Sequence, residues 1–392
     1  MDHQSLAAAM VEATRLTRER RLAEATALIQ RGLLGLPVDG ESGSVRADSP
    51  RPDRGRWPVT RALLGRRDGS SWPSTARTTT PSRPSPRILQ GLSGFASRLP
   101  GLAPMAPAGP ELPGETLLRS YRGPEGERPY LLYVPSGWTG EPVPLVVMLH
   151  GGMQGAAEFA AATRMNELAE EHTFLVAWPE QVPSANPGRY WNWFQPEDQR
   201  RGSGEASLIA GITARVLAEY SADPDRVYVA GFSAGAAMAA VMGASHSDVY
   251  AAVGVHSGLP HGAAEDVASA FEAMRQGPRR TRPLARAVPV ITFHGDADSV
   301  VSPVNAVKVI EQFAPAGGAS TVVTSTGRAP GGRTYSRTQV QRGRRGVAEQ
   351  WTVHGSGHAW SGGTAGGTYA DPAGPDASAE MVRFFAEHPA AD

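Results

Sequence analysis

The stretch Val227-Tyr-Val-Ala-Gly-Phe-Ser-Ala-Gly-Ala-Ala-Met238 joins an apolar, β-rich run to a run of small, helix-forming residues. At the junction stands Gly231-Phe-Ser-Ala-Gly235, a G-x-S-x-G pattern. The pattern predicts a tight strand-to-helix turn, because glycine at both ends lets neighbouring backbone approach where a Cβ would clash. Ser233 is then predicted at the amino terminus of the helix, where backbone N–H groups and the helix dipole favour a developing anion.

Strand-like and helix-like segments alternate on both sides of this turn, from about residue 115 onward. The run Pro144–His150 is continuously apolar, as expected of a strand buried on both faces. Repeated β-α alternation predicts an α/β fold with a doubly wound, mainly parallel sheet. The other predicted strands are 128–134, 174–179, 227–230, 251–256, 289–293 and 347–353, and the predicted helices are 156–172, 207–220, 303–313 and 377–388. Residues 262–286 are predicted as an insertion on the side where substrate loops lie.

The composition changes twice ahead of this α/β domain, which is predicted to span residues 114–392. Residues 36–113 are crowded with Pro, Gly, Ser, Thr and Arg, which predicts a largely disordered linker. Residues 1–35 are predicted as an N-terminal amphipathic helical segment, since apolar side chains recur there at roughly helical spacing, among them Leu22, Leu28, Ile29 and Leu33. Three interpretations stay open for this segment: packing on itself or on the main domain, docking to a partner or polymer surface, and a role at a membrane surface.

Charge and composition exclude several classes of protein. Lys and Arg number 38 and so do Asp and Glu, so bulk charge gives no indication of a nucleic-acid partner. There is no cysteine, which excludes disulfides, thiolate metal sites and a cysteine nucleophile. No apolar run has the roughly 18 residues of a membrane span. Charged residues interrupt the first thirty positions, so no signal peptide is recognisable, and together with the lack of cysteine this suggests a cytoplasmic location.

A serine is a weak nucleophile unless a base accepts its proton and a carboxylate orients that base. Both partners follow Ser233 in the chain order serine, acid, histidine that is found in α/β-hydrolases. The acid is predicted in Phe293-His-Gly-Asp-Ala-Asp-Ser-Val-Val301, where Asp298 is preferred as the orienter and Asp296 as a turn former. The base is predicted in the glycine-rich loop Val353-His-Gly-Ser-Gly-His-Ala-Trp360, where His358 is preferred over His354.

The oxyanion of an acyl-transfer reaction needs two backbone donors. One is predicted to be the N–H of Ala234, the residue after the nucleophile. The other is predicted in the turn Leu149-His-Gly-Gly-Met-Gln-Gly155, with Gly152 preferred and Met153 as the alternative. An aromatic group is predicted to line or support the substrate cleft, with Trp191, Trp193 and Trp360 as substrate-binding candidates. Glu205 is predicted as a helix cap.

These motifs together resemble the polyhydroxybutyrate depolymerase type of serine esterase, which is related to feruloyl and acetyl-xylan esterases. The matching pieces are Leu149-His-Gly-Gly-Met-Gln154, Trp191-Asn-Trp-Phe194, Pro196-Glu-Asp-Gln-Arg-Arg201, Asp223 to Gly235, His294-Gly-Asp-Ala-Asp298 and Gly357-His-Ala-Trp-Ser-Gly-Gly363. The resemblance implies an α/β-hydrolase fold with Ser233 as nucleophile, Asp298 as orienter and His358 as base, and extracellular activity in many relatives. Members of this type often carry cysteine where Gly152 and Tyr190 stand here, which leaves the rigidity of the oxyanion loop to packing.

The sequence therefore predicts a serine carboxylic-ester hydrolase that forms an acyl-enzyme, with a small or oligomeric ester as substrate. The chemistry requires no metal and no organic cofactor. A serine peptidase on the same fold is one alternative, and a non-catalytic binding module that kept the fold is another.

Overall fold

The computed structural model describes residues 112–282, 284–315, 320–343 and 345–390. The predicted helical segment 1–35 and the linker up to residue 111 lie outside the described residues. No helix in the described part of the chain is both long and apolar enough to cross a membrane.

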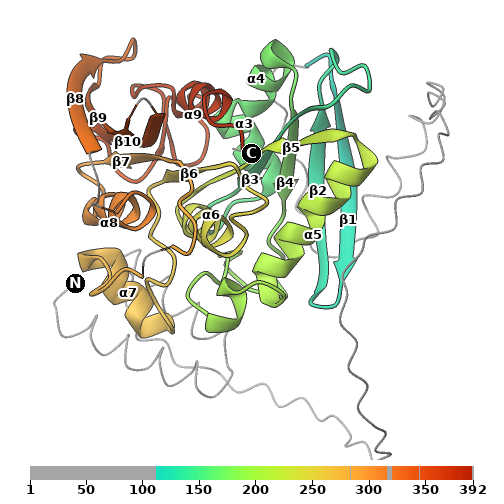
Figure 1. Ribbon diagram of the computed structural model, residues 1–392, viewed down its shortest axis with the longest axis horizontal. Helices are drawn as coiled ribbons and strands as arrows, with labels where there is room; N and C mark the ends of the chain where they lie inside the picture. The colour runs from blue at the N-terminus through green and yellow to red at the C-terminus, as the bar shows by residue number, and fades with distance from the viewer. Residues whose placement is uncertain (1–111, 283, 316–319, 344, 391–392) are drawn as a thin grey trace, which may run out of the picture. The chain divides into compact units, whose positions relative to one another are not determined.

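A ten-stranded sheet runs through the domain in the order β1-β2-β4-β3-β5-β6-β7-β10-β9-β8 (Figure 1). Its centre is parallel, from β4 across to β10, and antiparallel pairs complete both edges. The strands are β1 (Glu115–Gly123), β2 (Gly126–Val134), β3 (Val143–Leu149), β4 (Leu175–Pro179), β5 (Ala222–Phe232), β6 (Ala252–His256), β7 (Val290–Gly295), β8 (Ser320–Arg328), β9 (Thr334–Arg342) and β10 (Arg345–Val353). A short separate pair is formed by β11 (Trp360–Ser361) and β12 (Ala370–Asp371).

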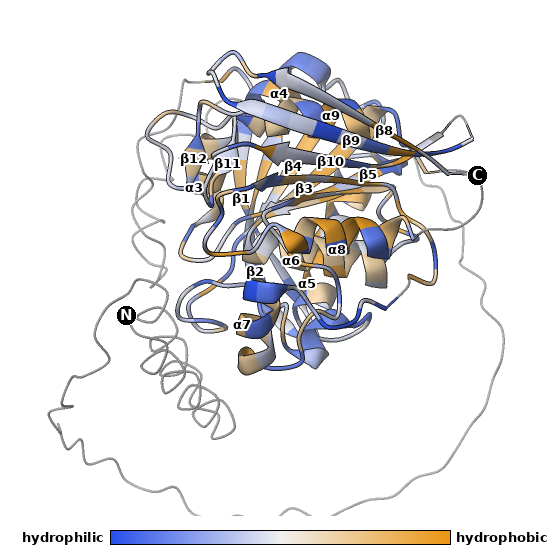
Figure 2. Ribbon diagram, turned by 90° about the vertical axis from the view of Figure 1, so that its left-hand side faces the viewer, coloured by the Kyte–Doolittle hydropathy of each residue, from blue (hydrophilic) through white to orange (hydrophobic). Residues whose placement is uncertain are grey.

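Helices cover both faces of the sheet, as Figure 1 shows. One face packs against α5 (Gly204–Glu219), α6 (Ala234–Ser245) and α8 (Val304–Phe313). The other packs against α3 (Ala156–Thr163), α4 (Met165–His172) and α9 (Ala377–Ala386). The hydrophobic colour in Figure 2 is strong in α6, and every residue from Ala234 to Gly243 is buried. This confirms the predicted α/β fold with a mainly parallel, doubly wound sheet.

Several elements differ from the sequence prediction. The predicted helix 156–172 is two helices, because Arg164 has a φ of 57° and ends α3 before α4 begins. Strands β1, β8 and β9 were not predicted. In β8 almost every residue is exposed, so it lacks the alternation of apolar and polar residues that marks a half-buried strand. The insertion 262–286 contains a helix, α7 (Val267–Gln276), and residues 196–199 form a 3₁₀ turn.

The parallel arrangement decides where functional side chains gather. Strands β3, β5, β7 and β10 run in one direction, so the loops that follow them leave the same edge of the sheet. These loops begin at His150, Ser233, Asp296 and His354. All four predicted catalytic motifs therefore meet at this edge.

Candidate active site

Ser233 lies on a strained turn between β5 and α6. Its backbone angles are φ 55° and ψ −118°, which place a non-glycine residue in the left-handed half of conformational space. A Cβ at Gly231 would lie 2.5 Å from the backbone of Gly235, and a Cβ at Gly235 would lie 2.1 Å from the carbonyl oxygen of Leu149. The glycines of the pattern are thus sterically required. The Ser233 N–H donates to the carbonyl of His256, which helps to hold the turn.

The structure brings Ser233, His358 and Asp298 together as a hydrogen-bonded triad. His358 Nε2 lies 2.9 Å from Ser233 Oγ, and His358 Nδ1 lies 2.7 Å from Asp298 Oδ2. Because the carboxylate accepts from Nδ1–H, Nε2 is left free to accept the serine proton. This triad has the geometry of a nucleophile, its base and the acid that orients the base.

Asp298 is held in its ionised form by its surroundings. Its other oxygen, Oδ1, accepts the N–H groups of Val300 and Val301, each at 2.9 Å. Burial acts to raise the pKa of this carboxyl, but the hydrogen bonds from His294 and His358 hold the pKa well below its ordinary value. An ionised Asp298 would favour a protonated His358, because opposite charges in contact attract.

The competing residues of the two loops pair with each other instead. His354 Nδ1 lies 2.8 Å from Asp296 Oδ2, and both side chains are about two-fifths exposed. His358, by contrast, has a side chain that is only 9% exposed. His358 is therefore the histidine that reaches Ser233, and Asp298 is the aspartate that reaches His358.

The turn after β3 lies against the turn that holds Ser233, since a Cβ at Gly235 would lie 2.4 Å from the carbonyl oxygen of His150. Its two candidate donors differ. Met153 N–H donates to the carbonyl of Gly188 at 2.7 Å, so it is already engaged. Within the described residues, the N–H groups of Gly152 and Ala234 have no hydrogen-bond partner. Of the predicted donors, the N–H groups of Gly152 and Ala234 are thus the ones whose hydrogen-bonding capacity is unused in the described residues.

His150 orients the backbone of this turn. The N–H of Gln181 donates to His150 Nε2 at 3.0 Å, so the ring proton is on Nδ1 and points to the carbonyl of Gly151, 2.8 Å away. Burial lowers the pKa of His150 to about 4, which keeps the ring neutral at neutral pH. A neutral His150 adds no positive charge beside the turn and fixes the direction of its peptide groups.

The aromatic residues take different positions from those expected. Trp191 is fully buried; its Nε1 donates to the carbonyl of His150 at 3.1 Å, beneath the oxyanion turn. Trp360 is 1% exposed and stacks on His256, with ring centroids 4.8 Å apart. These two side chains support the site from below and do not reach its surface, which corrects their assignment as substrate-binding residues. Trp193 does line the pocket beside Ser233.

Tyr190 covers the glycine of the oxyanion turn, a contact that the sequence did not reveal. A Cβ at Gly152 would lie 2.1 Å from Cε1 of the Tyr190 ring. Burial raises the pKa of Tyr190 to about 12, so its hydroxyl remains neutral. Ring-on-glycine packing therefore joins the two loops at the positions where members of the resembling family often carry cysteine.

Glu205 is the anchor of the aromatic loop. Its carboxylate accepts the backbone N–H and the Nδ2 of Asn192, at 2.7 and 2.8 Å, together with the side-chain amide of Gln181. Arg128 lies 3.4 Å away as its counter-ion. The predicted role as a helix cap is incomplete, because Glu205 lies in the first turn of α5 and its own N–H is accepted by Asp198.

A small, mainly apolar pocket of about 60 Å³ opens beside Ser233. Its lining from α7 is Val267, Ala270, Phe271 and Met274, and its remaining lining is Asn186, Tyr190, Trp193, Phe194, Ser233, Ala234, Leu259 and Val301. The insertion between β6 and β7 thus supplies one wall. None of these lining residues carries a charge.

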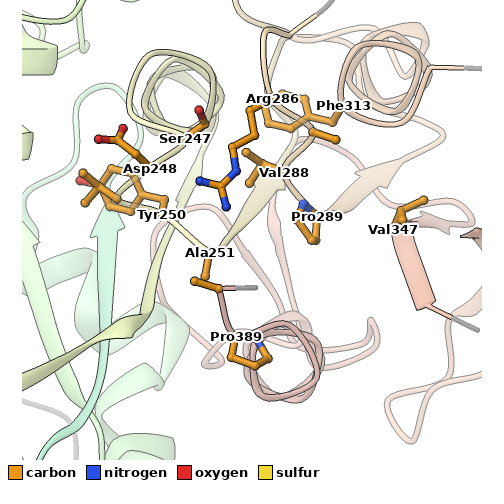
Figure 3. Close-up of a pocket in the computed structure, with 13 residues that line it drawn as sticks. Ser247, Asp248, Tyr250, Ala251, Arg286, Val288, Pro289, Phe313, Val347 and Pro389 are labelled. Atoms are coloured by element: carbon orange, nitrogen blue, oxygen red, sulfur yellow. The ribbon is translucent and has the colours of Figure 1, made fainter. Parts of the chain in front are cut away.

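A larger hollow of about 190 Å³ lies elsewhere, near the amino-terminal ends of β6, β7 and β10. Figure 3 shows Arg286 among its lining residues, together with Tyr250 and Pro389. Ser233, Asp298 and His358 are absent from this lining, since the parallel strands carry them to the opposite edge of the sheet. The smaller pocket is therefore the one that accompanies the candidate active site.

The fold and the serine–histidine–aspartate triad define an α/β-hydrolase. The family model described as "Esterase PHB depolymerase" matches residues 128–341, more than half of the chain, and the chain belongs to this family. This confirms the resemblance seen in the sequence.

Among known proteins, poly(3-hydroxyalkanoate) depolymerase C of Paucimonas lemoignei is 39% identical over 194 residues, which cover 46% of each chain. Feruloyl esterase B of Neurospora crassa is 34% identical over 141 residues, covering 35% of this chain and 46% of that protein. The chain thus spans about half the length of these relatives. An acetyl xylan esterase structure from Aspergillus awamori shares the fold, with a TM-score of 0.55 and 20% identity over 69% of this chain and 99% of that one.

Proposed function

We propose that this protein hydrolyses carboxylic esters through an acyl-enzyme on Ser233. The observation that carries the proposal is the unbroken triad from Ser233 Oγ through His358 to Asp298, with contacts of 2.9 and 2.7 Å. Family membership and the names of the relatives, which include a depolymerase and esterases, support the same reaction class.

In the first half of the reaction, Ser233 Oγ attacks the ester carbonyl carbon while His358 Nε2 takes the hydroxyl proton. The carbonyl oxygen becomes an oxyanion and accepts the N–H groups of Gly152 and Ala234. The tetrahedral intermediate collapses, the bond to the alcohol oxygen breaks, and His358 returns its proton to the leaving alkoxide. Water then attacks the acyl-enzyme by the same route and releases the acid and free Ser233.

The pocket beside Ser233 supports a substrate with a short apolar group. Its lining is mostly aromatic and aliphatic, and its volume of about 60 Å³ leaves little room for a long chain. No acidic side chain is among the described residues that line it. A site for a peptide amino terminus would need such a carboxylate, so the pocket favours ester hydrolysis over the peptidase alternative.

The test is the variant Ser233→Ala with p-nitrophenyl acetate as substrate. We expect kcat to fall at least about 1,000-fold, because the three residues of the triad act as a unit and the variant lacks the nucleophile. Ser245→Ala, at the other end of the same helix, is the matched control and should retain the wild-type rate, with circular dichroism confirming that both variants fold. A near wild-type rate in Ser233→Ala would overturn the proposal.

A further inference from the structure

Ser336, His354 and Asp296 form a second hydrogen-bonded triad beside the first. His354 Nδ1 is 2.8 Å from Asp296 Oδ2, and His354 Nε2 is 2.9 Å from Ser336 Oγ. The same ring atoms face the same groups as in His358, and the distances are nearly equal. We call the segment that follows β7, from Asp296, the acid loop, and the segment that follows β10, from His354, the base loop. Two carboxylate–imidazole pairs thus join these loops.

The second triad lacks the other features of a nucleophile site. Ser336 lies within β9, where its Cα partner in the antiparallel ladder is Thr352 of β10. It has no strained turn and no helix amino terminus, the two features that present Ser233 with nearby N–H donors. The second triad therefore has a base and an acid but no place for an oxyanion.

The second pair joins the two loops close to the strands from which they leave. Asp296 Oδ1 accepts the N–H of Gly355 at 2.7 Å, while its backbone N–H donates to the carbonyl of Val353. One residue further along, Ala297 N–H donates to the carbonyl of Ser356 at 3.1 Å. These bonds connect the loops step by step from the strand ends toward the pair formed by Asp298 and His358.

Two glycines give the base loop a backbone freedom that its contacts must remove. Between His354 and His358 stand Gly355, with a φ of 71°, and Gly357, whose missing Cβ would meet no atom within 4 Å. Glycine has the greatest backbone freedom of any residue, so a loop of this composition has many conformations in the absence of contacts. The bonds of His354 restrict the start of the loop, and Arg333 Nη1 on the Gly355 carbonyl and the Ser356 hydroxyl on Asp371 restrict the residues that follow.

We propose that Asp296 and His354 are positioning residues for the reaction: they fix the register of the base loop on the acid loop, so that His358 meets both Asp298 and Ser233. This inference rests on the proposed function, since it assigns a role in the same active site. Ser336 holds the far side of the His354 ring through its hydroxyl.

The test compares Asp296→Ala, which removes both acceptors, with Asp296→Asn. The Asn variant keeps an oxygen for the Gly355 N–H and offers an amide N–H to His354 Nδ1, with the ring proton on Nε2 facing the Ser336 hydroxyl. Glu127→Ala is the matched control, because Glu127 is also an exposed carboxylate in a hydrogen-bonded pair, with Arg122 on the distant β1–β2 hairpin. We expect Asp296→Ala to lower kcat roughly 10- to 100-fold, as a misplaced catalytic group does. KM should stay within about twofold, since substrate binding is untouched.

The rate of labelling of Ser233 by a fluorophosphonate probe should fall in parallel with kcat, and Asp296→Asn should recover most of both. The melting temperature should change no more than in Glu127→Ala, which separates positioning from general loss of stability. Wild-type kcat in Asp296→Ala, or a rise in KM alone, would overturn the inference while leaving Ser233→Ala as the independent test of the proposed function. Labelling of Ser336 in the Ser233→Ala variant would also overturn it, by revealing a second nucleophile.

Discussion

Replacing Gly152 by alanine should disturb the oxyanion turn through a single steric contact. The new Cβ would lie 2.1 Å from Cε1 and 2.2 Å from Cδ1 of Tyr190, whereas ordinary contact begins at 3.4 Å. The ring or the turn must therefore move by more than 1 Å. Tyr190 has little room to yield, since Gln181 holds its carbonyl at 2.9 Å and its ring is largely buried.

Two magnitudes follow from this displacement. Overpacking of this kind costs about 1–3 kcal/mol of the free energy of unfolding. Misplacing one oxyanion donor lowers kcat by about 10²- to 10³-fold. Both effects are measurable, by urea denaturation and by hydrolysis of p-nitrophenyl acetate.

A double-mutant cycle identifies the Tyr190 ring as the cause. Adding Tyr190→Ala removes the clashing atoms, so the double variant should lose about 1–3 kcal/mol less than the sum of the single losses. Gly346→Ala is the control, because a Cβ there meets its nearest atom only at 3.8 Å. If Gly152→Ala keeps the wild-type kcat, or if the cycle shows no coupling, the placement of Tyr190 against the oxyanion turn is refuted.

Two further predictions concern the pocket wall and the buried carboxylates. Phe271→Ala should widen the pocket beside Ser233 and raise kcat/KM for p-nitrophenyl hexanoate relative to the acetate by severalfold, because each buried CH₂ contributes about 0.8 kcal/mol. The exposed Arg275→Ala on the same helix should leave the ratio unchanged, and an unchanged ratio in Phe271→Ala would exclude α7 as the wall. Burial, followed in size by the charge of Glu205, raises the pKa of Asp198 to about 7. The folded state therefore keeps the Asp198 proton up to a higher pH than the unfolded state does. The free energy of unfolding should then fall as pH rises from about 4 to 7. Glu205→Gln removes the charge of Glu205, so the free energy of unfolding of this variant should fall less steeply with pH than that of the wild type. Urea denaturation at several pH values measures both curves. Parallel curves would contradict the electrostatic coupling of Glu205 to Asp198.

The central strands could be predicted from the sequence because they are buried on both faces. Mainly apolar runs such as Val143–Leu149 and Val290–Phe293 indicate buried strands when helical segments alternate with them. The edge strand β8 could not be predicted, because it is exposed on both faces and backbone pairing alone leaves no mark in the side-chain pattern. In Ser320–Arg328 the register depends on Thr334–Arg342, which follows only after a turn.

The sequence favoured Asp298 over Asp296, but it could not supply the physical reason for that preference. Asp296 and Asp298 are two residues apart, and both follow the same buried strand. Chain order places either one near the base loop, but only the loop conformation decides which carboxylate turns inward. The structure gives Asp298 two backbone N–H donors and near-complete burial, while Asp296 stays two-fifths exposed.

The aromatic motif shows why residue type alone misplaced a function. A tryptophan near an active site suggests contact with substrate, yet Trp191 is needed where water must be kept out. Burial lowers the pKa of His150, so the ring stays neutral, and its Nδ1–H donates to the carbonyl of Gly151 next to Gly152. Trp191 covers that ring and donates to the carbonyl of His150. In a chain without cysteine, the rigidity of the turn that contains Gly152 therefore depends on packing: the buried, neutral His150 on one side and the Tyr190 ring on the other. Substitutions that expose His150 to water should impair catalysis although they change no group that contacts the substrate.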